Sequence, residues 1–305
     1  MSQDQGSQGA DAASSELFTF SLYHYTPSLP AAILSVAIFA ILTATHAWRM
    51  HRAGSLYFTP FTIGGLFEVL GYAGRIWSHY DPLAIGGFVI QAILILVAPA
   101  LYAASIYMIL GRLIRTMNAQ HLSIIPVNRL TRIFVTGDVV SFTLQAGGGG
   151  IQAAGTLDLY NIGEKIIIVG LFVQIALFSM FVAVSVTCYV RLRASDPPLA
   201  AVVENRIPWK RHLYALFATS VLILVRSVFR VVEYLQGNGG YLISHEAFLY
   251  IFDMALMVAV MVIFAIWYID DLQGKNTYGK PLQNYSSDAN DDDQQRIILQ
   301  DLRQA

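Results

Sequence analysis

The chain has 305 residues, of which 55% are hydrophobic and only 13% charged, with a formal net charge of −1. A soluble globular domain carries about 25% charged residues, so this composition excludes an ordinary soluble domain. The balanced charge also argues against a nucleic-acid partner. The single cysteine, Cys188, excludes an intramolecular disulfide.

Seven apolar stretches follow one another along the chain. Residues 1–27 are polar, lack Lys and Arg, and contain no apolar core of a signal peptide, so we expect an extracellular tail there. The stretches long enough to span a bilayer are 28–48, 56–77, 83–110, 128–153, 163–189, 209–235 and 244–269. We therefore predict an all-α protein whose membrane domain, 28–272, is a bundle of seven transmembrane helices. Residues 273–305, with their acidic run at 291–293, are typical of a disordered cytosolic tail.

The distribution of basic residues predicts the orientation of the bundle, because cytosolic loops are enriched in Lys and Arg. Fifteen of the 19 Lys and Arg residues lie in the first, third and fifth loops and in the C-terminal tail. The other four lie within predicted helices or at their ends. We therefore expect the N-terminus outside and the C-terminus in the cytosol.

Three predicted helices carry ionisable and tyrosine side chains at positions i, i+4 and i+7, which places each triplet on one helical face. The triplets are Glu68, Tyr72 and Arg75; Arg226, Arg230 and Glu233; and Glu246, Tyr250 and Asp253. The predicted helix 128–153 adds Asp138 and Gln145 on one stripe. A charge at the bilayer centre costs about 2.5–3.5 kcal/mol, so we expect these side chains to face the interior of the bundle. These eleven residues are our candidates for ligand binding or a proton relay.

Two interpretations of these residues remain open. Interhelical ion pairs that stabilise the bundle account for any single pair, such as Arg226 with Asp253. A polar cavity that opens to the outside accounts better for the whole set, and its surplus of acidic groups suits protons or an amine-bearing ligand. The four glycines at 147–150 allow a close helix approach, a broken helix or a frayed helix end.

Motifs of enzymes and receptors are missing from the sequence. It contains no nucleotide-binding glycine pattern and no nucleophile elbow, and its seven histidines lack the spacing of zinc ligands. The helix-end signatures of G-protein-coupled receptors are missing too. We therefore predict that the protein is not an enzyme and needs no metal or cofactor. An enzyme that uses paired carboxylates for acid/base chemistry inside the membrane stays an alternative hypothesis for the function of the protein.

An ordered set of motifs indicates a family. The motifs include Glu68-x2-Gly71-Tyr72-x2-Arg75, Asp138-x6-Gln145-Ala146-Gly147, Arg226-x2-Phe229-Arg230-x2-Glu233-Tyr234 and Glu246-x3-Tyr250-x2-Asp253. With these motifs the chain resembles the fungal lipid-translocating exporter family, which includes resistance-to-aminocholesterol and sphingoid long-chain base resistance proteins. The resemblance implies seven helices and export or transbilayer movement of sphingoid bases. It also implies tolerance of amphipathic toxins and, in one branch, porphyrin uptake.

These observations lead to two functional hypotheses. In the first, the protein is a multi-pass protein of the plasma membrane that exports or translocates amphipathic lipids. Its cargo would be sphingoid long-chain bases or sterol-like and amine-bearing toxins, and its partners would be membrane lipids and a cationic amphiphile. Transport would be downhill or coupled to an ion gradient, because no ATP site is present. In the second, it is a seven-helix lipid sensor that acts on a cytosolic protein through its basic loops and its C-terminal tail.

Overall fold

The computed structural model describes residues 28–81, 85–116, 120–123, 125–152, 157–194, 209–237 and 240–267. Every regular element in these ranges is a helix. The predicted tails at 1–27 and 273–305 lie outside the described residues.

All seven predicted helices are present. Six of them are single long helices: α2 (Leu29–Ala53), α3 (Thr59–Tyr80), α4 (Ile85–Thr116), α5 (Val127–Gln152), α6 (Leu157–Ala194) and α8 (Trp209–Leu235). The seventh is built from short pieces: α9 (Tyr241–Ser244), α10 (Glu246–Leu249), the π-helical segment η3 (Tyr250–Ala255) and α11 (Leu256–Ile266). Two 3₁₀ turns, η1 (Leu56–Phe58) and η2 (Gln120–Leu122), precede α3 and α5.

Three predicted helices were too short: the first was expected to end at residue 48, whereas α2 continues to Ala53. We expected helices at 83–110 and 163–189, whereas α4 continues to Thr116 and α6 runs from Leu157 to Ala194. An apolar stretch of sequence marks only the part of a helix that lies in the bilayer. The hydrogen bonds of the helix continue beyond that part into polar surroundings, so the observed helices are longer than predicted. Helix starts and ends follow local signals: proline stands in the first turn of α2 and α3, and Gly54, with φ of 66°, ends α2.

Five of the seven helices are long and apolar enough to cross a membrane: α2, α4, α6, α8 and the one formed by α10, η3 and α11. The other two, α3 and α5, contain glycines and polar side chains, among them Glu68, Arg75 and Asp138, which lower their hydropathy. Those three side chains are at most 5% exposed, so they lie inside the bundle and not on its surface.

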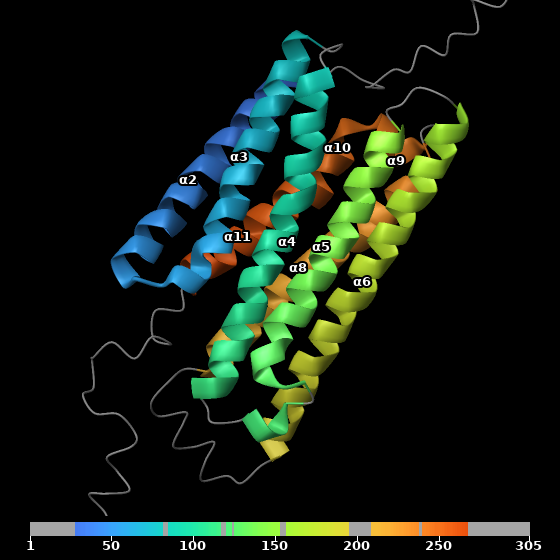
Figure 1. The fold of residues 1–305 in the computed structure, drawn as a ribbon. Coiled ribbons are helices and arrows are strands. Elements are labelled where there is room, and N and C mark those ends of the chain that lie inside the picture. Colours follow the sequence, from blue (N-terminus) through green and yellow to red (C-terminus); the bar gives the residue numbers. More distant parts are fainter. Residues whose placement is uncertain are drawn as a thin grey trace, which may run out of the picture. The chain divides into compact units, whose positions relative to one another are not determined.

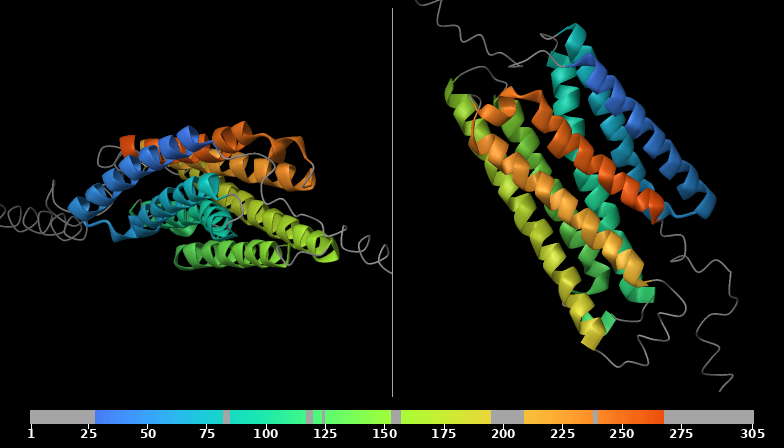
Figure 2. Two further views of the ribbon diagram at one scale, coloured as in Figure 1. Left: turned by 90° about the horizontal axis from the view of Figure 1, so that it is seen from above. Right: turned by 180° about the vertical axis from the view of Figure 1, so that it is seen from behind.

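Consecutive helices lie side by side from α2 to α6, and α8 returns against both α6 and α4 (Figure 1). The last helix then lies between α8 and α2, as the view from behind shows (Figure 2). A larger share of α4 is buried inside the structure than of the other four helices that are apolar enough to cross a membrane. Helix α4 is therefore the central helix of the bundle, and α3, α5 and α8 pack against it.

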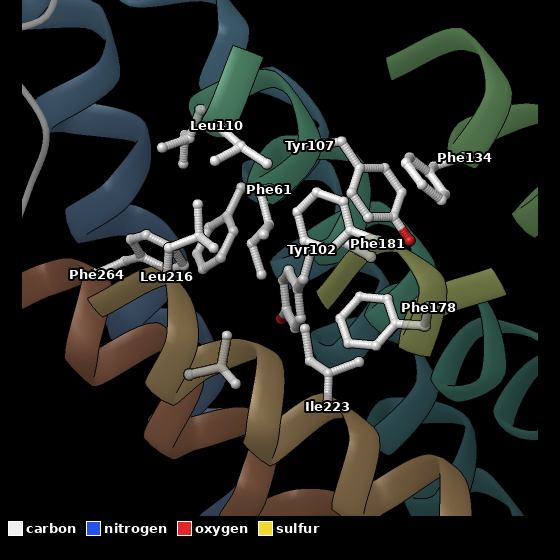
Figure 3. Close-up of a cluster of buried hydrophobic side chains, with 14 of the residues drawn as sticks. Phe61, Tyr102, Tyr107, Leu110, Phe134, Phe178, Phe181, Leu216, Ile223 and Phe264 are labelled. Carbon is white, nitrogen blue, oxygen red and sulfur yellow. The ribbon is translucent and has the colours of Figure 1, made fainter. Parts of the chain in front are cut away.

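A core of buried aromatic and aliphatic side chains packs between the helices (Figure 3). Its side chains come from the first parts of α3, α5 and α8 and from the last parts of α4, α6 and α11, which meet there because neighbouring helices are antiparallel. Phe61 lies 4.6 Å from Tyr102, and Tyr107 lies 4.5 Å from Phe181, between ring centroids. Most of the candidate site residues come from the opposite parts of these helices, and Tyr72 belongs to both the core and the candidate site.

The four glycines late in α5 mark a close helix contact. Helix α5 is continuous through them to Gln152, so it is not broken there. A Cβ atom at Gly148 would lie 2.7 Å from the carbonyl oxygen of Gly163 on α6, whereas one at Gly147 would meet nothing within 4 Å. Of the three interpretations, the structure supports close approach, and it assigns that role to Gly148.

Candidate functional site

Asp253 is the centre of a buried ionic network between α8 and η3. Arg226 Nε lies 2.8 Å from Asp253 Oδ1, and Arg230 pairs with the same carboxylate through Nε and Nη2. Arg230 Nη1 also lies 2.8 Å from Glu233 Oε2. Asp253 is 1% exposed and Arg226 2% exposed. We call Glu68, Arg226, Arg230, Glu233 and Asp253 the Asp253 network.

The helices position this network through their own geometry. The spacing of Arg226, Arg230 and Glu233 places all three on one face of α8, as predicted from the sequence. Asp253 lies in the π-helical segment η3, a form of helix that is often found at functional sites. Arg226 Nη2 also donates a hydrogen bond to the carbonyl oxygen of Ile95 on α4, at 3.0 Å. The network therefore joins two consecutive helices, α8 and the one that contains η3, to α4, which lies far earlier in the sequence.

Glu68 on α3 differs from the other acids of the network. It is 1% exposed, and neither of its carboxylate oxygens has a hydrogen-bond partner among the described residues. It interacts electrostatically with Arg226, Asp253 and Arg230 without a direct ion pair to any of them. An ionised carboxylate that is buried without a hydrogen bond is strongly unfavourable, so Glu68 requires a proton, a water or a cationic group.

A second group, which we call the Ser28 cluster, consists of Ser28, Arg75, Glu246 and Tyr250. Arg75 Nη2 lies 2.7 Å from Glu246 Oε1, and Tyr250 donates its hydroxyl hydrogen to the same oxygen at 3.2 Å. The backbone N–H of Ser28, just before α2, donates to Glu246 at 2.8 Å. This cluster holds the start of α2, the late part of α3 and the start of α10 together.

Tyr72 lies between the Ser28 cluster and the Asp253 network. Its ring stacks on Phe39 with centroids 5.5 Å apart and on Tyr250 with centroids 6.2 Å apart. Its hydroxyl group is buried and has no hydrogen-bond partner among the described residues, and it interacts electrostatically with Glu68 and Asp253. The nine candidates on α3, α8, α10 and η3 thus form one continuous polar region.

The remaining two candidates, Asp138 and Gln145, make other contacts. Asp138 Oδ2 accepts a hydrogen bond from the hydroxyl group of Tyr107 at 2.9 Å. Gln145 Nε2 donates to Ser141 Oγ at 3.0 Å and to Gln174 Oε1 at 3.1 Å. These contacts join α5 to α4 and α6, so Asp138 and Gln145 lie apart from the region that the other nine residues form. The expectation of one shared interior for all eleven was therefore too broad.

The predicted outward-opening cavity does not appear among the two cavities that we describe. The larger, of about 490 Å³, is an open groove between α5 and α6, and the smaller, of about 10 Å³, is enclosed by α4, α6 and α8. Neither is lined by any candidate residue. In this state, Arg226 and Arg230 contact Asp253 directly. Among the described residues, no three His, Cys, Asp or Glu side chains come together as a metal site would require.

The partners in these contacts that were not predicted from the sequence include Tyr107, Gln174, the backbone N–H of Ser28 and the carbonyl oxygen of Ile95. Only the last has a sequence signal. Pro99 stands four residues after Ile95 and has no N–H, so the carbonyl group of Ile95 lacks its usual donor within the helix.

Comparison with known proteins places the chain among fungal membrane proteins. Residues 61–276 match the family model described as "RTA1 like protein". The chain is 36% identical over 283 residues to "Protoporphyrin uptake protein 1" of Saccharomyces cerevisiae, covering 81% of this chain and 91% of that protein. It is 36% identical over 272 residues to "Protein RTA1" of the same yeast, covering 81% and 84%.

A more distant relative has a name that states a lipid cargo. The chain is 26% identical over 268 residues to "Sphingoid long-chain base transporter RSB1" of Saccharomyces cerevisiae, covering 78% of this chain and 70% of that protein. The descriptive names among these relatives refer to uptake and transport and not to an enzyme. No solved structure matches the chain.

Proposed function

Because the chain belongs to the family of RTA1-like proteins, we propose that it moves amphipathic lipids or amine-bearing amphiphiles across a membrane and so confers resistance to them. It is an integral membrane protein by the apolarity of its helices and by its relatives. A relative that is named a sphingoid long-chain base transporter supports a cargo with an amine and a long apolar chain.

We propose that all seven helices span the plasma membrane, with the N-terminus outside and the C-terminus in the cytosol. Most of the described Lys and Arg residues outside the candidate site support this orientation, with Lys165 near the start of α6 as the exception. Arg49 and Arg52 end α2, Arg112 and Arg115 end α4, and Lys210 and Arg211 begin α8, all at one end of the antiparallel bundle. An epitope tag at residue 2 should bind antibody on intact cells, while a tag at residue 305 should require permeabilised cells.

The observation that carries the proposed function is Glu68, a buried acid that has no hydrogen-bond partner among the described residues, while the neighbouring acids Glu233 and Asp253 are paired with arginines. The Asp253 network and the Ser28 cluster together contain four carboxylates, Glu68, Glu233, Glu246 and Asp253, and three guanidinium groups, Arg75, Arg226 and Arg230. When all are ionised, one negative charge is left over, and Glu68 is the residue that lacks a direct ion pair. One proton or one substrate amine balances that charge.

A site that accepts either a proton or an amine can exchange one for the other. In the described state, Glu68 is 1% exposed and lines neither of the two described cavities, which suits a proton better than a larger ligand. When Glu68 loses the proton, the excess negative charge favours entry of a cationic headgroup, and the apolar chain of the cargo stays in the surrounding lipid. Proton and cargo would therefore move in opposite directions, with no need for ATP.

The Ser28 cluster would control access to this site from the outer side. Glu246 connects α10 to Arg75 on α3 and to the start of α2, so these three elements cannot separate while its contacts are intact. Opening the bundle near Glu68 requires that the Arg75–Glu246 ion pair break.

The test is transport by purified protein in liposomes, with a fluorescent sphingoid base inside and a pH gradient across the bilayer. We expect movement of the base with the wild-type protein and at least tenfold less with Glu68→Gln. Asp138→Asn is the matched control, because Asp138 is also a buried acid in a helix but lies outside the Asp253 network. It should retain most of the transport.

Flux no greater than in empty liposomes, with a correctly folded wild-type protein, would refute the transport function. The lipid-sensor hypothesis would then be favoured. In that case, the sphingoid base should change the protein's thermal stability without crossing the membrane.

A further inference from the structure

A groove of about 490 Å³ lies on the surface of α5 and α6, away from the candidate site. On α5 it follows one helical face from Arg132 through Ile133 and Gly137 to Val140. Val173 and Leu177 of α6 form its other wall. A Cβ atom at Gly137 would overlap Leu177 Cδ1, so the missing side chain of this glycine is what lets the helices approach and shapes the floor.

The groove is apolar apart from Arg132 at one end and Thr136 one turn further along α5. Ile133 is 42% exposed and Val140 51% exposed, on the face of a helix that crosses the bilayer in the proposed arrangement. Arg132 is the one charged residue in the lining, and no acid lines the groove. Arg132 is exposed and has no hydrogen bond or ion pair with any described residue. The apolar part of the groove therefore suits an acyl chain, and the guanidinium group of Arg132 at its end suits a phosphate.

We propose that this groove binds one anionic phospholipid of the cytosolic leaflet, with an acyl chain along Ile133, Val140 and Leu177 and the phosphate on Arg132. The inference uses the proposed orientation, which places the start of α5 at the cytosolic surface. The volume lies within the usual range for small-molecule sites, about 300–1,000 Å³. Anionic lipids are enriched in the cytosolic leaflet, where basic side chains attract them.

A second copy of the chain fits the groove less well. In a two-fold dimer along the membrane normal, each groove would face its counterpart, and the two Arg132 side chains would lie near each other without a counter-charge. A lipid phosphate, in contrast, supplies the missing negative charge.

The test measures lipid binding to the purified full-length protein by native mass spectrometry, with phosphatidylserine and phosphatidylcholine of the same acyl chains. We expect about fivefold stronger binding of phosphatidylserine, the preference expected from one lipid-facing basic residue. Arg132→Gln should bring the two affinities within about twofold of each other.

Two tryptophan variants test whether the binding is in the groove. Val140→Trp fills it and should remove the tight binding of phosphatidylserine. Val139→Trp is the matched control, because Val139 is the adjacent residue, is 56% exposed, and does not line the groove. It should bind phosphatidylserine as the wild type does.

Equal binding of the two lipids by the wild type would overturn the proposal. So would equal losses in the two tryptophan variants, or a wild-type dimer that Val140→Trp converts to a monomer. Because the readout is lipid binding by isolated protein, a failure here is separate from a failure of transport in liposomes.

Discussion

Arg226 on α8 and Pro99 on α4 act on the same atom, the carbonyl oxygen of Ile95. Pro99 has no N–H to donate to this oxygen, which leaves it without its helical partner, and Arg226 Nη2 donates to it instead at 3.0 Å. The same arginine holds Asp253 Oδ1 through Nε at 2.8 Å. A proline in the central helix thereby creates the acceptor that orients an arginine of the ionic network.

This relationship predicts an energetic coupling between Pro99 and Arg226. In Pro99→Ala, the new N–H of residue 99 takes over the carbonyl group of Ile95, so Arg226 loses one acceptor. Arg226→Met should therefore cost about 1–2 kcal/mol less in the Pro99→Ala background than in the wild type. The measurement is a double-mutant cycle of thermal unfolding in detergent. Additive effects within about 0.5 kcal/mol would show that the two residues are independent.

Two acids of the same network should differ sharply in their effect on stability. Asp253→Asn leaves two buried arginines short of a counter-charge and should destabilise the protein by about 3–5 kcal/mol. Glu68→Gln removes no direct ion pair and should change the stability by less than about 1 kcal/mol while it abolishes transport. Melting temperatures of the purified variants test this difference. Equal losses would mean that Glu68 is a structural acid like Asp253.

Breaking the Ser28 cluster should expose the polar region from the outer side. Ser78 lies on α3 beyond Arg75 and is buried, so a Ser78→Cys reporter should react slowly with a membrane-impermeant maleimide. The background is Cys188→Ser, which removes the natural thiol. Glu246→Gln weakens the contact with Arg75 and should raise the labelling rate at least severalfold, because ionic hydrogen bonds are about twice as strong as neutral ones. Glu164→Gln, also partly buried but outside the cluster, should leave the rate unchanged.

Adjacent glycines in α5 should respond oppositely to the same substitution. Gly148→Ala places a methyl group 2.7 Å from the carbonyl oxygen of Gly163 and should destabilise the contact between α5 and α6 by about 1–3 kcal/mol. Gly147→Ala meets open space and should be neutral or stabilise the helix by up to about 1 kcal/mol. Thermal unfolding of both variants decides the point. A similar loss in both would mean that the glycines serve backbone flexibility and not close approach.

Several features of the polar region could be predicted from the sequence. The spacing of Glu68, Tyr72 and Arg75 places them on one face of their helix, and the cost of a charge in lipid directs that face inward. The excess of acids over bases among the candidates was also evident. These predictions depend only on the geometry of one helix at a time and on the properties of its solvent.

The sequence by itself determined the number of helices, their order and the direction in which each polar side chain leaves its helix. Only the tertiary structure decided that Asp253 pairs with two arginines, that Glu68 pairs with no arginine among the described residues, and that Asp138 pairs with Tyr107. Pairing depends on the rotation and axial shift of one helix against the next, which are set by contacts such as that of Gly148 with Gly163. A shift of one turn moves a side chain by about 5.4 Å, more than the length of any ion pair, so spacing along a single helix cannot determine the partner.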